Sequence, residues 1–235
     1  MDWSTPIDLY CERTDASLWA EPANALTNAA FLIAAAAAFV LWRRQRARDA
    51  ASDGGRANGR DLPALALIVV VVAVGLGSFA FHTAATRGAM LADVIPIAIF
   101  IYGYLLLALR RFLYLPAGVA IAIVVAYAAG AQALSWLAPG RALNGSVGYL
   151  PALVALVVVA RTARGPARRA LELAVMLFTL SLALRTIDLD ACETFALGTH
   201  FLWHLLNAAV LYVLLRAVIK ESGSGTAASA RHGNS

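Results

Sequence analysis

Residues Gly75–Ile97, GLGSFAFHTAATRGAMLADVIPI, close one long apolar run and open the next. Polar side chains lie at the seam, with Ser78 and His82 near the end of the first run and Asp93 near the start of the second. Apolar runs of about 20 residues predict membrane-spanning helices. Ionisable side chains inside such a span are costly to bury and usually have a function. The stretch therefore predicts a helical hairpin with a functional site beside its turn.

The composition of the whole chain supports a membrane protein. Hydrophobic residues make up 61% of its 235 residues and charged residues 14%, and the mean hydropathy is +0.72. Soluble domains are nearer half apolar and a quarter charged. Because backbone polar groups inside a bilayer must be satisfied within their own segment, the runs are expected to be helices. We predict an all-α polytopic membrane protein with seven transmembrane helices, from apolar runs at residues 24–42, 62–82, 89–109, 112–134, 147–160, 169–186 and 198–219.

These runs divide the chain into three parts. Residues 1–23 are expected to be an extracytoplasmic N-terminal segment, and residues 24–219 a seven-helix transmembrane domain that carries the candidate site. Residues 220–235 are rich in glycine and serine, so we expect a disordered cytoplasmic tail. The arginine-rich stretch 43–60 is expected to be a mobile loop between the first two helices.

The basic residues indicate the orientation of the chain. With seven helices, 15 of the 19 lysines and arginines fall on the side of the C-terminus and four on the side of the N-terminus. Because cytoplasmic loops are enriched in Lys and Arg, we expect the N-terminus outside and the C-terminus in the cytoplasm. The net charge of +5 then reflects topology and requires no nucleic-acid partner. Abundant arginine and alanine suggest a GC-rich bacterial genome, so we expect the bacterial inner membrane.

Topology alone brings three histidines to one membrane depth. The run 62–82 ends on the outer side, and the runs that hold Asp93 and the pair His200 and His204 begin there. Histidines at i and i+4 share one helix face, and a third histidine from another helix gives the pattern of catalytic zinc. Zinc would lower the pKa of a bound water to about 7. Asp93 could then accept its proton and Ser78 could donate to an oxyanion.

The residues alone leave other interpretations open. The His200 and His204 pair is also compatible with a haem or a proton relay, and a transporter built on such a relay would bind no zinc. Ser78 could be a helix-packing residue, and Asp93 a counter-ion for Arg87.

The N-terminal segment is acidic. Asp8, Glu12, Asp15 and Glu21 offer the hard oxygen ligands that calcium prefers, although their spacing is not that of an EF-hand loop. The alternative is an outer-surface segment in which Glu21 and the following proline begin the first helix.

The two cysteines, Cys11 and Cys192, both fall on the expected outer, oxidising side. We predict that they form a disulfide that ties the N-terminal segment to the loop before the last helix; two free thiols are the alternative.

Four motifs in order resemble the alkaline ceramidase family: CE followed by WAEPANALTN, then GLGSFAFH, LADVIPI and HFLWH. This family belongs to a superfamily of seven-helix membrane hydrolases that also includes adiponectin-type receptors, and the resemblance covers roughly residues 7–219. It implies zinc held by His82, His200 and His204 with a water in the open position. It also implies that Asp93 acts as general base with Ser78 beside it.

The resemblance further implies a calcium site next to the zinc, and the cysteine pairing also looks like a family feature. Two positions depart from the family pattern, because Asp8 lies three residues before Cys11 instead of two and Thr14 stands where the family has an asparagine. The calcium ligands that the resemblance implies are Asp8, Tyr10, Glu12, Thr14 and Glu21.

The expected function is zinc-dependent intramembrane hydrolysis of the amide bond of ceramide or a ceramide-like N-acyl lipid. The products would be a free fatty acid and a sphingoid-type amine, with the acyl chain held between the helices. One alternative is a related membrane hydrolase that cuts an ester or a phospholipid. Another is a lipid receptor or sensor of adiponectin-receptor type, although the CE…WAEP segment favours the ceramidase branch.

Overall fold

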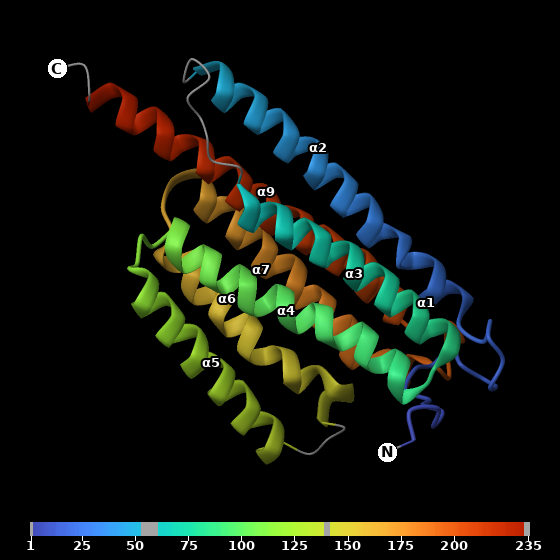
Figure 1. Ribbon diagram of the computed structural model, residues 1–235. Helices are drawn as coiled ribbons and strands as arrows, with labels where there is room; N and C mark the ends of the chain where they lie inside the picture. Colours follow the sequence, from blue (N-terminus) through green and yellow to red (C-terminus); the bar gives the residue numbers. More distant parts are fainter. Residues whose placement is uncertain (1, 53–60, 139–141, 233–235) are drawn as a thin grey trace.

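The computed structural model describes residues 2–52, 61–138 and 142–232. In these ranges the regular secondary structure is helical, apart from one isolated β-bridge between Pro6 and Thr86, so the predicted all-α fold is confirmed. Figure 1 shows the long helices lying side by side, with the N-terminal segment and the end of the last helix at opposite ends of the bundle. In chain order the helices are α1 (Pro22–Thr27), α2 (Ala29–Ser52), α3 (Leu62–Ala84), α4 (Arg87–Arg111), α5 (Ala117–Leu137), the 3-10 segment η1 (Ala142–Tyr149), α6 (Leu150–Thr162), α7 (Gly165–Thr186), α8 (Asp188–Ala191) and α9 (His200–His232).

Six of the described segments are long and apolar enough to cross a membrane. The remaining predicted span is the sixth apolar run, 169–186, which corresponds to α7; this helix is 22 residues long but carries Arg168, Arg169 and Glu172 near its start and Arg185 near its end. These charges shorten its apolar stretch, so seven spans stay a prediction. The six segments are Pro22–Ala51, Leu62–Ala84, Arg87–Arg111, Ala117–Leu137, Ala142–Thr162 and His200–Glu221.

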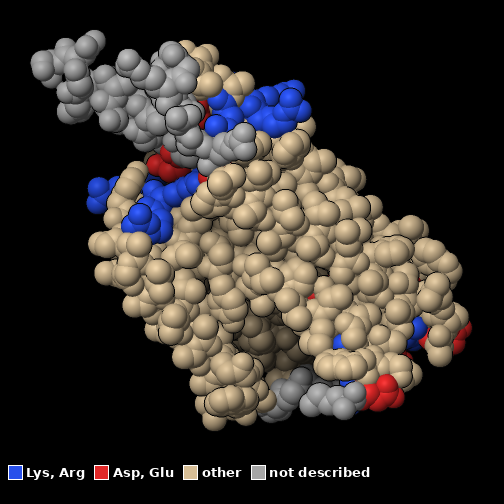
Figure 2. Space-filling model, in the orientation of Figure 1, with Lys and Arg blue, Asp and Glu red and all other residues tan. Residues whose placement is uncertain are grey.

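Charged side chains lie at the two ends of the molecule. On the face shown in Figure 2, Lys, Arg, Asp and Glu gather at these ends, and the surface between them is uncharged. A protein surrounded by hydrocarbon needs such an uncharged belt, because ionised side chains facing lipid are costly. This distribution and the six apolar helices fit an integral membrane protein.

Two helices extend into segments that the sequence predicts as irregular. α2 continues to Ser52, so the first part of the expected loop 43–60 is helical, and Gln45 donates to Asp49 one turn later at 2.9 Å; residues 53–60 lie outside the described ranges. α9 continues to His232, so the expected disordered tail is helical up to that residue. Extending an existing helix avoids the cost of nucleation, and arginine and alanine favour helix.

The connection after α4 also differs from the predicted run 112–134. α4 ends at Arg111, Tyr114 adopts a left-handed conformation with φ of 54°, and Pro116 precedes the first turn of α5. Proline fixes its own φ and lacks an N–H donor, which suits a helix start better than a helix interior. The fourth span therefore begins later than the apolar run.

The N-terminal segment folds back against the helix ends that carry the candidate site. Ile7 N donates to Ala85 O at 2.7 Å, just after α3. A disulfide joins Cys11 to Cys192 across 181 positions in the chain, with the two Cα atoms 5.4 Å apart, as predicted. The segment is thus attached at two points to one end of the bundle, after α3 and before α9.

Helices α3 and α4 approach each other closely at Gly77. A Cβ atom at this position would lie 1.9 Å from the carbonyl oxygen of Ala92, so only glycine fits. Ser78 and Asp93 are the next residues on the two helices. The close approach therefore brings these two polar side chains to the same place.

We predict that Gly77→Ala destabilises the protein by about 1–3 kcal/mol, because the added methyl group forces α3 away from α4. The matched control is Gly130→Ala in α5, where no atom lies within 4 Å of the Cβ position. Thermal unfolding of both variants in detergent measures the effect. Equal stability of the two variants would contradict the close packing.

Candidate metal centre

Three buried histidines converge at the end of the bundle where the N-terminal segment lies. His82 comes from the last turn of α3, and His200 and His204 come from the first two turns of α9. One ligand atom from each lies within 4.8 Å of the others, and each residue is at most 1% exposed. Among the described residues, no other His, Cys, Asp and Glu side chains form such a group of three. The sequence correctly predicts this convergence.

The hydrogen bonds of the histidines fit a metal ion. His82 Nδ1 lies 2.6 Å from Glu21 Oε2, and His204 Nδ1 lies 3.0 Å from Thr27 Oγ1. His82 Nε2 and His200 Nδ1 are buried and have no hydrogen-bond partner in the described part of the chain. A metal-bound histidine usually gives its second nitrogen to a carboxylate or hydroxyl, as two of these do. Three neutral imidazoles are also the ligand set of many catalytic zinc sites.

Glu21 is the buried acid behind His82. Besides His82, it accepts hydrogen bonds from Arg13 Nε at 2.5 Å and from Asn24 Nδ2 at 3.1 Å. Burial by itself raises the pKa of the Glu21 carboxyl, but the hydrogen bonds from His82 and Arg13 outweigh burial, so its pKa lies below the usual value. A carboxylate that stays ionised can hold the His82 ring in one orientation. The following residue, Pro22, begins α1, so a helix start fixes the position of this acid.

Asp188 connects the start of α9, which carries His200 and His204, to the N-terminal segment. It is completely buried, and its carboxylate accepts from Thr199 N at 2.7 Å, His200 N at 2.8 Å and Cys11 N at 3.1 Å. Two of these donors are at the start of α9, where helix N–H groups otherwise lack partners. Gly198, with φ of 62°, leaves room for the carboxylate, because a Cβ there would lie 2.3 Å from Asp188 Oδ1. This acid therefore fixes the helix end that carries His200.

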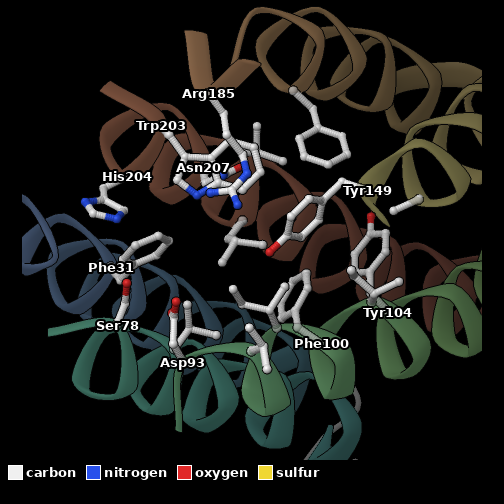
Figure 3. Close-up of a pocket in the computed structure, with 18 of the residues that line it drawn as sticks. Phe31, Ser78, Asp93, Phe100, Tyr104, Tyr149, Arg185, Trp203, His204 and Asn207 are labelled. Atoms are coloured by element: carbon white, nitrogen blue, oxygen red, sulfur yellow. The ribbon is translucent and has the colours of Figure 1, made fainter. Parts of the chain in front are cut away.

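Ser78 and Asp93 lie beside the histidines. Figure 3 shows both side chains pointing into one cavity from α3 and α4, with His204 on the opposite wall. Ser78 is 4% exposed and Asp93 9%, and Asp93 Oδ1 is buried without a hydrogen-bond partner among the described residues. A buried acceptor without a donor is unfavourable, so this oxygen is suited to a proton or a donor supplied by a ligand.

The cavity behind this group is largely apolar. Figure 2 shows a hollow in the lower middle of the face in view, and the cavity is lined mainly by residues of α4, α6 and α9. The polar lining lies at the histidine end, and the remaining walls suit a hydrocarbon chain. Polar residues at that end include Ser78, Asp93, Arg185, His200, His204 and Asn207, and apolar residues beyond them include Ile97, Phe100, Leu105, Ala108, Leu156, Val159, Leu211 and Leu214.

The predicted calcium ligands have different surroundings. Asp8 and Thr14 are exposed, whereas Tyr10 is buried and its ring stacks on His200 with centroids 3.7 Å apart. The two oxygens of Glu12 accept from the backbone N–H groups of Ala23 and Asn24 at 2.6 and 2.8 Å, which fixes the start of α1. Glu21, the last of the five predicted calcium ligands, is paired with the Arg13 guanidinium. Because these five side chains have such different surroundings, calcium binding by them stays a prediction.

Three further residues of the site are not identified from the sequence. Asp188 and Arg185 lie at the outer end of the sixth apolar run, where an ionisable residue is a signal for function. Thr27 has no comparable signal, because threonine is common in membrane helices.

Comparison with known protein families gives one match. The family model described as Ceramidase matches residues 6–222, which includes all three histidines, Ser78 and Asp93. Comparison with individually curated proteins gives no match.

We predict that Glu21→Gln weakens metal binding by about 10- to 100-fold, because the neutral amide holds His82 less firmly than a carboxylate does. The control is Glu172→Gln, which changes an acid with a 42% exposed side chain paired to Arg168 on α7. Competition with a zinc chelator measures the affinity of each variant. Unchanged affinity in Glu21→Gln would show that the carboxylate does not support the metal ligand.

Proposed function

The chain belongs to the ceramidase family, and we propose that it is a zinc-dependent membrane amidase that hydrolyses ceramide or a ceramide-like N-acyl lipid. Its products would be a free fatty acid and a sphingoid-type amine. One observation carries the proposal: Ser78, Asp93 and two of the three clustered buried histidines line the polar end of an apolar cavity. A ceramidase-type hydrolase needs this combination, because its substrate has a polar amide between hydrocarbon chains.

His82, His200 and His204 would hold the zinc ion. When bound there, zinc would supply a water of lowered pKa and polarise the amide carbonyl. Asp93 would take the proton of the attacking water through its unpaired Oδ1 and pass it to the departing amine nitrogen. Ser78 Oγ would donate a hydrogen bond to the carbonyl oxygen as negative charge develops on it. Water and the amide are consumed, and one acid and one amine are released.

The cavity walls would orient the lipid. The acyl chain would lie among the apolar side chains of α4, α6 and α9, which exclude bulk water from the reacting amide. The hollow in Figure 2 would let a lipid enter sideways from the bilayer.

For the membrane topology we propose seven spans, with α7 as the additional one. Figure 1 shows α7 within the bundle, and it packs mainly against α9 and α6. The bias of 15 of 19 basic residues to one side supports a cytoplasmic C-terminus and an extracytoplasmic active site. The proposed location is the bacterial inner membrane.

We predict that His204→Ala abolishes both zinc binding and lipid-amide turnover, since two histidines do not complete the site. Asp93→Asn is expected to keep zinc but to lower kcat by about 100- to 10,000-fold through loss of the base. Metal content and release of fatty acid from a ceramide panel measure the two effects on purified protein.

The matched control is His232→Ala, which changes the one histidine outside the group. Full turnover by metal-free His204→Ala would exclude the proposed mechanism.

A further inference from the structure

Arg185 is a charged cavity residue that the proposed mechanism leaves unused. Figure 3 shows its side chain reaching from α7 into the cavity beside Trp203 and Tyr149. One guanidinium nitrogen, NH1, donates to Tyr10 Oη at 3.0 Å. Its Nε is buried and has no hydrogen-bond partner within the described ranges. The Nε–H donor is thus available to a ligand.

The surroundings of this cation are neutral rings. Its central carbon lies 5.2 Å from the ring centre of Trp203 and 5.6 Å from those of Tyr10 and Tyr149. Ring faces attract a cation but do not cancel its charge. No carboxylate among the described residues lies within 4.0 Å of it, although Asp93 faces the same cavity. Asp93 acts on this cation only from a distance, so a buried guanidinium without a directly paired carboxylate would gain from an anionic ligand.

We propose that Arg185 binds an anionic group, of carboxylate type, on the amine-derived half of the lipid substrate. The guanidinium fork matches the two oxygens of a carboxylate. Tyr10 contacts both Arg185 and His200, so the anion subsite lies one aromatic ring away from the histidine group. A lipid whose amide carbonyl reaches the histidines then has the atoms after its nitrogen near Arg185. This inference rests on the proposed amidase function, and of the two substrate classes proposed there it favours a ceramide-like N-acyl lipid with an anionic amine half over neutral ceramide.

The test compares two lipids that share an acyl chain, N-oleoylglycine with a carboxylate and N-oleoylethanolamine without one. Wild-type protein should favour the acidic lipid in kcat/KM. Arg185→Met should lower the acidic-to-neutral ratio by about 10- to 100-fold, the value of a charge-assisted hydrogen-bonded pair. The control Arg87→Met, at an exposed arginine near the same membrane side, should keep the wild-type ratio. Equal ratios in wild type and Arg185→Met would overturn the assignment to the substrate.

A second arm uses binding alone, because the same chemistry occurs in the fatty-acid product. The melting temperature of wild-type protein is measured with oleate and with oleyl alcohol, which needs no variant to fold. Stabilisation by oleate but not by oleyl alcohol, lost in Arg185→Met, supports the anion subsite. If the substrate ratio is unchanged at the same time, the subsite is assigned to the fatty-acid product. The absence of any preference for the anion overturns the subsite. Anion binding without turnover of either lipid or of the ceramide panel would overturn the amidase function and leave the subsite standing.

A second inference rests on a different observation, the buried guanidinium of Arg13. The residue is 8% exposed. Besides the bond from Nε to Glu21, NH1 donates to the carbonyls of Asp15 at 3.2 Å and Ser17 at 3.3 Å, and NH2 donates to the carbonyl of His82 at 3.3 Å. One carboxylate and three carbonyl oxygens surround this cation, and such hard oxygens also suit a divalent ion.

We infer that Arg13 is a built-in cation that takes the position of a divalent ion in the N-terminal segment. Its guanidinium neutralises Glu21 and connects the loop around Ser17 to the last turn of α3. It thereby positions Glu21 against His82 without a calcium ion. A calcium ion at the same oxygens would be repelled by the guanidinium.

The wild-type protein is therefore expected to contain no stoichiometric calcium by elemental analysis, and calcium should change its melting temperature no more than magnesium does. Arg13→Ala should weaken zinc affinity by about 10- to 100-fold, and Arg13→Lys, which keeps the charge, should recover part of it. Arg164→Ala at an exposed arginine is the control. Stoichiometric calcium in wild-type protein, or a calcium-specific rise in its melting temperature, would overturn the inference even if Arg13→Ala fails to fold.

Discussion

Three imidazoles buried in an apolar bundle require partners for their nitrogens, and this requirement shapes the end of the molecule where the N-terminal segment lies. An unsatisfied polar group in hydrocarbon costs several kcal/mol. Glu21 and Thr27 satisfy the outer nitrogens of His82 and His204, which leaves the inner nitrogens for an ion. The N-terminal segment, the ends of α3 and α9 and the cavity all meet at these three histidines.

The N-terminal segment is the element that connects these partners. It supplies Glu21 to α3, its Cys11 N–H to Asp188, and its Tyr10 ring to the face of His200. The disulfide to Cys192 fixes it covalently beside α9. The segment before the first span is thus part of the wall of the site. Its buried Arg13 joins Glu21 to the carbonyl oxygens of Asp15, Ser17 and His82.

Much of this arrangement can be predicted from sequence because membrane helices reduce the problem to topology. The chain must reverse its direction between consecutive spans. The hairpin at 75–97 and the start of α9 therefore bring His82, His200 and Asp93 to one membrane depth, which can be predicted without knowledge of packing. The disulfide follows from the same sidedness. Helix ends are less predictable, since α2 and α9 extend beyond their apolar runs; the extension of α2 is rich in arginine and alanine, but that of α9 contains two glycines that disfavour a helix.

The polar partners could not be predicted in the same way. From the sequence, Glu21 is predicted as a calcium ligand and Arg13 is only one of the four basic residues on the N-terminal side, because their pairing depends on how residues 13–21 fold back. Asp188 reaches Cys11 and the start of α9 only through a turn that Gly198 permits. Arg185 could have been marked as an ionisable residue in an apolar run, but its aromatic surroundings come from three separate elements.

Zinc K-edge X-ray absorption on the purified protein tests the central claim most directly, because it reports the ligands of the metal without a substrate. The account predicts stoichiometric zinc with three imidazole nitrogens and one oxygen ligand at about 2.0 Å. Fully active protein without bound metal, or a metal shell containing sulfur or fewer than three imidazoles, would contradict it.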